Sequence, residues 1–207
     1  APCSEIYNQF TTKYGDDAEK AVRNYVKKMM GRLVFIQFLQ KKGWLGIPAN
    51  QSDWHGGDTD FLQNIFTEVS PEDRANFVDN ILEVIFFEAF NTKENERHIN
   101  NATLKKYRYP FLNCGLFDRD EDDRFKCTLP PAVFSNAKFS FTPRKAPDFK
   151  NWSKKRNPYF NSEACGLFDF FDRFNFTIDE NDPTDAEVSV DPEMLSKIFE
   201  NLLEDNK

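Results

Sequence analysis

DDAEKAVRNYVKKMMGRLVFIQFLQKK, residues 16–42, is the strongest helix signal in this chain of 207 residues. Apolar side chains recur along it at the three- and four-residue spacing of one helix face. Its second half, residues 33–39, is apolar nearly all round, which indicates a helix buried on most sides. Gly43 is expected to end the helix. The basic residues of this helix are expected to form its solvent-exposed stripe: Lys27, Lys28, Arg32, Lys41 and Lys42.

The rest of the first half also favours helices. Residues 60–66 predict a short helix, and Ser70 with Pro71 predicts the start of another that runs to about Phe90. Residues 91–101 are polar and predict a connector, and residues 118–124 predict a charged surface loop.

From residue 109 onward the sequence changes character. Gly and Pro interrupt it at many positions. Many of the 23 Phe lie in this half, and we expect their rings to form most of its core. Residues 139–142 and 174–178 alternate with period two and predict short strands that could pair. We therefore expect a mainly α fold, an irregular helical domain with a small two-stranded β element in the second half.

A last helix is predicted over residues 191–203, with Asp191 as its N-cap and Pro192 at its first position. The chain has no initial Met and stops soon after this helix, so we expect it to be an internal piece of a longer protein. The expected organisation is a helical subdomain (1–108), a loop-rich, Phe-rich subdomain (109–190) and a helix (191–207) leading into a missing catalytic domain. The helix is expected to dock on that domain through its apolar stripe: Met194, Leu195, Ile198, Phe199, Leu202 and Leu203.

Charge is unevenly distributed along the chain. The net charge of −7 disfavours tight non-specific nucleic-acid binding by the chain as a whole. Residues 138–157, however, carry seven cations and one anion, interleaved with aromatic rings that could anchor the segment or stack on a base. The alternative interpretation is a charged loop exposed to solvent, whose aromatic side chains pack into the core. The candidate DNA contacts are Lys138, Arg144, Lys145, Lys150, Trp152, Lys154, Lys155 and Arg156.

Sequence patterns for metal sites and membrane spans are missing. The four Cys stand far apart and there are only two His, so no zinc site is expected and the thiols are predicted to be free in a reducing cytoplasm. No run of 18 apolar residues and no secretory signal occurs, which predicts a cytoplasmic protein that does not span a membrane.

Two short motifs resemble catalytic ones without their context. Residues 157–160, NPYF, lack the second Pro of an adenine-binding loop and follow a basic run rather than a strand. Residues 148–150, DFK, give an acid-x-Lys triplet with no convincing acidic partner on an upstream strand. We therefore predict no catalytic residues in this chain, and an independent hydrolase is the weakest hypothesis.

Three segments carry a family resemblance. Residues 32–45, RLVFIQFLQKKGWL, resemble a helix upstream of the methyltransferase domain in large bacterial restriction–modification methylases. Residues 109–117, YPFLNCGLF, resemble that family's proline-aromatic-leucine-Asn-Gly-Gly-leucine-Phe turn, with Cys114 at the first Gly. Residues 174–180, FNFTIDE, and 190–203, VDPEMLSKIFENLL, resemble the segment that leads into the cofactor-binding motif, with Ser196 where Gly is expected.

The resemblance implies the helical region of an adenine-specific DNA methyltransferase of type II restriction–modification or related phage-defence systems. S-adenosylmethionine would be bound by the missing methyltransferase domain rather than by this chain. The expected function is a non-catalytic helical scaffold that contacts DNA within the full-length protein. The alternative hypothesis is a protein–protein or interdomain docking module with no DNA role.

Overall fold

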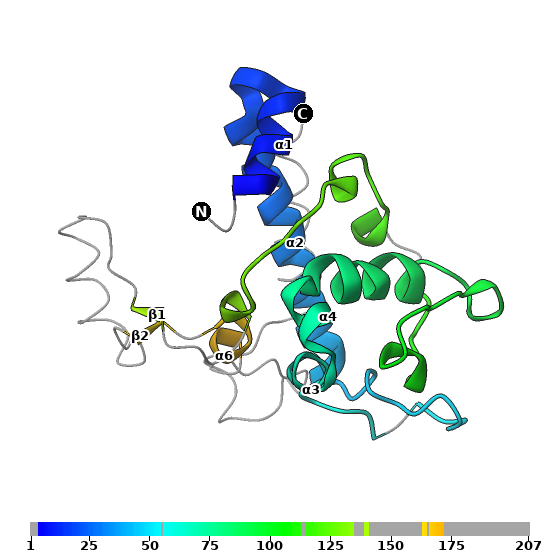
Figure 1. Cartoon of the computed structure of the whole chain (residues 1–207). Helices are drawn as coiled ribbons and strands as arrows, with labels where there is room; N and C mark the ends of the chain where they lie inside the picture. Colours follow the sequence, from blue (N-terminus) through cyan, green and yellow to red (C-terminus); the bar gives the residue numbers. More distant parts are fainter. Residues whose placement is uncertain are drawn as a thin grey trace, which may run out of the picture. The chain divides into compact units, whose positions relative to one another are not determined.

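A computed structural model describes residues 4–54, 56–112, 115–134, 139–140, 163–164 and 166–171. The described residues up to Leu129 belong to one compact unit, and those of Pro130–Arg173 belong to a second. The fold is mainly helical, as the sequence predicts (Figure 1). The predicted division into residues 1–108, 109–190 and 191–207 stays a prediction.

The first unit is built on the long predicted helix, which is present as α2 (Ala18–Lys41). A helix that the periodicity does not predict, α1 (Ser4–Tyr14), precedes it across the 3-10 turn η1 (Gly15–Asp17) and packs against it (Figure 1). The backbone at Gly43 is left-handed, with φ of 71°, and its N–H donates to the Gln40 carbonyl at 2.8 Å. Gly43 therefore ends the helix as predicted.

The helices predicted after the long one are present with altered geometry. Helix α3 (Phe61–Glu68) packs on α2, and α4 (Pro71–Ala75) begins where predicted, with the Ser70 hydroxyl accepting from the Asp73 N–H at 3.0 Å. The run to Phe90 is wound as two π-helices, η2 (Val78–Leu82) and η3 (Val84–Phe90), rather than as a continued α-helix. Phe86, Phe87 and Phe90 are all buried in this run.

Short 3-10 turns complete the first unit: η4 (Glu94–Glu96), η5 (Leu104–Lys106), η6 (Gly115–Phe117) and η7 (Asp122–Arg124). An antiparallel bridge between Pro48 and Tyr107 ties the loop after α2 to the segment after η5. The fully buried ring of Phe117 lies 5.1 Å from that of Phe90 and 5.9 Å from that of Phe86, measured between centroids. The turn η6 thus contributes a buried side chain to the core that packs on η3.

The second unit contains η8 (Pro131–Val133), the strands β1 (Phe139–Ser140) and β2 (Glu163–Ala164), and α6 (Leu167–Phe171). The strands are antiparallel, with Phe139 opposite Ala164 and Ser140 opposite Glu163. A ladder of two residue pairs is too short to confirm the predicted small β element. The pairing of residues 139–142 with 174–178 is not tested either, because 141–142 and 174–178 lie outside the described residues.

Across the described part of the chain, no helix is both long and apolar enough to cross a membrane.

Candidate functional site

The two surfaces singled out from the sequence lie outside the described residues. This holds for all eight candidate DNA contacts between Lys138 and Arg156 and for the docking stripe from Met194 to Leu203. It also holds for the two short catalytic-like motifs at residues 148–150 and 157–160. These assignments stay predictions, and the polar chemistry that the structure does describe lies in the first unit.

A buried ion pair joins α2 to the turns after residue 115. The Arg32 guanidinium, 1% exposed, donates to both Asp123 carboxylate oxygens, from Nη1 at 2.6 Å and from Nη2 at 2.8 Å. It also donates from Nε to the Leu116 carbonyl at 2.8 Å and from Nη2 to the Asp118 carbonyl at 3.0 Å. The prediction that Arg32 lies on an exposed stripe is therefore wrong. A planar guanidinium with this full set of acceptors can be buried where a lysine could not.

The acidic segment that receives Arg32 is not simply a surface loop. Asp123 is 2% exposed, and its Oδ2 also accepts from the Lys28 ammonium at 3.2 Å and the Asp120 N–H at 3.1 Å. Burial alone would raise the pKa of the Asp123 carboxyl, but the hydrogen bonds and charge of Arg32 outweigh burial and hold this pKa below its ordinary value. The predicted surface loop at residues 118–124 is thus wrong at Asp123, because a buried arginine needs a buried carboxylate.

This pair gives a physical reason why two of the quoted segments occur together. Arg32 is the first residue of the segment 32–45, and Leu116 lies in the segment 109–117. Their direct hydrogen bond, and the edge-to-face contact of the Phe35 and Phe117 rings at 5.6 Å, fix one segment against the other. The two segments therefore form one structural unit.

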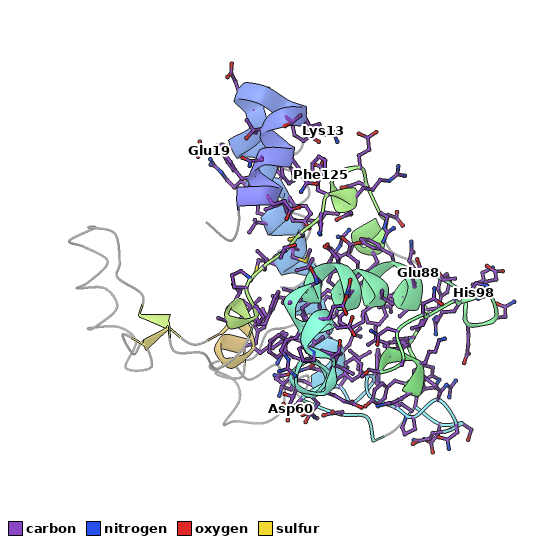
Figure 2. The ribbon with its side chains drawn as sticks, in the orientation of Figure 1. Lys13, Glu19, Asp60, Glu88, His98 and Phe125 are labelled. Atoms are coloured by element: carbon purple, nitrogen blue, oxygen red, sulfur yellow. The ribbon has the colours of Figure 1, made fainter. Side chains whose placement is uncertain are left out.

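A polar pocket of about 320 Å³ is formed by the segments after η3 and around η5. Three cationic side chains, Arg97, Lys105 and Arg108, line it against a single carboxylate, Glu94. Figure 2 labels His98, another lining residue, in the loop that follows η3. The sequence prediction treated residues 91–101 only as a polar connector, so this pocket was missed.

Backbone pairing positions the arginines of this pocket. The Arg108 N–H donates to the Ile47 carbonyl and the Ala49 N–H donates to the Lys106 carbonyl, both at 2.8 Å. The Arg108 guanidinium lies 4.4 Å from the centre of the Trp54 ring and donates from Nη1 to the Gln51 carbonyl at 2.8 Å. It is thereby held in one orientation by a cation–π contact and a hydrogen bond.

Two backbone carbonyls hold the Arg97 guanidinium in place. Its Nη1 donates to the Tyr109 carbonyl at 3.1 Å and its Nη2 to the Thr92 carbonyl at 3.0 Å. Its Nε is buried and has no hydrogen-bond partner. Burial lowers the pKa of Arg97 from its ordinary value, while the nearby Glu94 acts in the opposite direction. The positive charge of Arg97, together with the charges of Lys105 and Arg108, favours an anionic ligand in the pocket.

Metal sites and S-adenosylmethionine sites each have a characteristic pattern of side chains and glycines. Among residues 4–54, 56–112, 115–134 and 166–171, no three His, Cys, Asp or Glu side chains come together to hold a metal ion. Their left-handed glycines, Gly15, Gly43, Gly46 and Gly56, lie at a helix end or in the loop after α2, not between a strand and a helix. The usual site for S-adenosylmethionine is a strand-to-helix glycine turn, so none of these four glycines marks such a turn. Binding of S-adenosylmethionine elsewhere in a longer parent stays a prediction.

One carboxyl group next to the Arg32 pair carries a strongly shifted pKa. Burial raises the pKa of Glu83 to about 7, although the Arg119 guanidinium, 3.2 Å from its Oε2, acts in the opposite direction. The neighbouring carboxylates of Asp79 and Asp123 contribute to the rise. Glu83 pairs with Arg119 and is not among the residues that line the pocket, so we interpret its shift as structural.

Comparison with known proteins finds one informative similarity. The chain is 26% identical over 184 residues to a Methanocaldococcus jannaschii protein named "Putative type II restriction enzyme and methyltransferase". The match covers 87% of this chain but 12% of that protein, so the chain spans about an eighth of its relative's length. No protein-family model matches the chain. No solved structure matches it either.

Proposed function

We propose that this chain is a helical, non-catalytic part of a larger restriction–modification protein that methylates adenine in DNA with S-adenosylmethionine as donor. In that protein it would act in the cytoplasm, where the DNA substrate lies, and in defence against phage. Its role would be to support the methyltransferase domain and to contact the DNA backbone.

The observation that carries this proposal is the similarity to the archaeal protein across 87% of the chain. The three segments that resemble restriction–modification methylases agree with it. The Arg32–Leu116 hydrogen bond holds two of these segments against each other in the fold.

The test uses the full-length parent protein. We expect it to transfer a labelled methyl group from S-adenosylmethionine to the N6 atom of adenine in duplex DNA. Digestion of the product to nucleosides, followed by mass spectrometry, distinguishes N6-methyladenine from methylated cytosine. A product methylated only at cytosine, or no labelled DNA, would contradict the proposed reaction.

The DNA-contact role has its own test in the same protein. Replacing Lys154, Lys155 and Arg156 with Ala should weaken DNA binding and flatten its dependence on salt, since each lost phosphate contact lowers the slope of log K against log salt by about 0.9. The control replaces Lys20, an exposed lysine of α2, with Ala. If the triple variant binds like the parent, the docking-module alternative is favoured.

A further inference from the structure

The pocket lined by Arg97, Lys105 and Arg108 is the strongest unassigned feature of the described residues. No sequence pattern marks these residues, and the proposed function does not depend on the pocket. Its volume of about 320 Å³ exceeds what a few ordered waters occupy, so a phosphate group can enter it.

The charges of the pocket favour an anion. Three cationic side chains line it, and Glu94, the opposing carboxylate, has a side chain that is 69% exposed and lies 3.7 Å from the Arg108 Nε. The Lys105 ammonium has no ion-pair partner among the described residues. An exposed carboxylate at that distance screens little of the positive potential, because solvent weakens surface ion pairs.

The donors of the pocket are preorganised. Arg97 is fixed by the Tyr109 and Thr92 carbonyls, and Arg108 is fixed by the Gln51 and Ser52 carbonyls and the Trp54 ring. Fixed guanidinium donors lose little conformational entropy when they bind an oxyanion. Lys105, by contrast, is exposed and can reach toward a ligand as a point charge.

We propose that this pocket binds a phosphate group between the fixed guanidinium groups of Arg97 and Arg108, with Lys105 as the mobile cation. The assignment of that phosphate to the backbone of DNA rests on the proposed function. The phosphate site itself does not, because its chemistry depends only on residues of this chain.

The test follows arginine Nε–H signals in ¹⁵N-labelled chain by NMR while inorganic phosphate is added. We expect the Arg97 signal to move and saturate. Lys105→Gln should weaken phosphate binding about tenfold, the loss of one charge-assisted contact. Lys20→Gln, which removes the same charge from an exposed site on α2, should leave it unchanged. Because Lys105 is exposed, its replacement does not threaten the fold.

Two results would overturn the phosphate site: an Arg97 signal that stays fixed as phosphate is added, or equal weakening by Lys105→Gln and Lys20→Gln. A second titration with a short DNA duplex then identifies the source of the phosphate. Movement of the same signal, reversed by inorganic phosphate, supports backbone binding. Movement with inorganic phosphate alone refutes the DNA assignment but supports a small phosphorylated ligand, and it leaves the proposed methyl transfer untouched.

Discussion

At the scale of single residues, the buried pair of Arg32 and Asp123 is the most consequential feature of the first unit. Both side chains are almost completely buried, and each neutralises the charge of the other. The guanidinium also lies 4.9 Å from the centre of the Phe87 ring and 5.4 Å from that of Phe86. Such a pair adds little net stability compared with a well-packed apolar one, but loss of either partner leaves an isolated buried charge.

We therefore predict that Arg32→Met and Asp123→Asn each lower the free energy of unfolding by about 3–5 kcal/mol. The double variant should lose less than the sum of the two single changes, since it leaves no uncompensated charge. Urea unfolding followed by circular dichroism measures all three. Arg23→Met is the matched control: Arg23 is 63% exposed and pairs with Glu19 along the same helix, so its loss should cost less than about 1 kcal/mol. Additive single changes would contradict a coupled pair.

Glu83 makes a prediction about pH. Its carboxyl has a pKa raised to about 7, chiefly by burial, against an ordinary value of 4.5. A raised pKa means that the folded state prefers the protonated form. The stabilisation that this provides is fully present below pH 4.5 and is lost as the pH rises through 7.

Glu83→Gln cannot ionise and should escape this loss. Relative to the unmodified chain, its melting temperature should rise between pH 5 and pH 8, by about 2–4 °C for each kcal/mol recovered. Thermal melts of both proteins at several pH values give the difference in their melting temperatures. The effects of the other titrating groups are common to both proteins and cancel in this difference. The exposed Glu96 gives the control Glu96→Gln. A pH-independent difference for Glu83→Gln would show that the carboxyl is not protonated in the folded state near neutral pH.

At the scale of elements, the sequence predicts helices well where one face is continuously apolar. Helix α2 is an example. The Ser70 cap, a local N-terminal signal, likewise predicts the start of α4. Helix α1 was missed because its apolar pattern is sparse and it contains Thr11 and Thr12, which favour other conformations. In the structure both hydroxyls donate to the carbonyls four residues earlier, at 2.9 and 2.8 Å. Such back-bonding cannot be seen in a pattern of hydrophobicity.

Local sequence patterns also do not predict the tertiary contacts that hold α1 in place. Phe10 packs its ring on those of Tyr25 and Phe125, at centroid distances of 5.5 and 4.8 Å, and so anchors α1. Near the same end of α1, the Lys13 ammonium lies 5.4 Å from the centre of the Phe125 ring, and both residues are labelled in Figure 2. Phe125 comes from more than 100 positions away along the chain, a distance over which spacing rules carry no information.

The start of α3 shows the same dependence on tertiary contacts. Asp60 precedes the helix but its side chain does not cap it. Instead, the buried Gln40 of α2 accepts from the Leu62 N–H at 3.0 Å, and its amide donates to Gln37 and Gln63 at 3.0 and 3.2 Å. A glutamine that the sequence places on the apolar face of α2 is thus the cap of the next helix.

Gln40→Met preserves volume but removes this acceptor, so it should lower the free energy of unfolding by about 1–3 kcal/mol. The distinguishing measurement is amide hydrogen exchange. The first turn of α3 should exchange faster in the variant, while α4, capped by its own Ser70, should change only as much as global stability does. Ser70→Ala provides the reverse comparison and should lose about 1 kcal/mol through α4. Uniform acceleration in both helices would mean that Gln40 acts only as core filling.

At the scale of the whole molecule, the candidate phosphate pocket was beyond the reach of sequence analysis. Arg97, Lys105 and Arg108 lie in a polar segment without periodicity, and nothing in it indicates a site. The pocket exists because residues 47–49 pair with residues 106–108, a contact between segments almost 60 positions apart. The basic segment between Lys138 and Arg156 shows the opposite case: its composition is obvious, and its role stays a prediction.

If both surfaces contact DNA in the full-length protein, their effects on salt dependence should add. Each phosphate contact that is lost lowers the slope of log K against log salt by about 0.9. Lys105→Gln should therefore reduce the slope by about 0.9, Lys154, Lys155 and Arg156 to Ala by up to about 2.7, and the combined variant by the sum. Fluorescence anisotropy with a labelled duplex, measured at salt concentrations between about 50 and 300 mM, gives all three slopes.

Additivity is the informative outcome because independent phosphate contacts release separate counterions. The Lys20→Gln variant controls for the general loss of one positive charge, and its slope should match that of the parent protein. A combined variant with the slope of the triple variant alone would place the pocket away from the DNA. Equal slopes in all variants would instead mean that the catalytic domain makes every backbone contact and that this chain serves only to hold it.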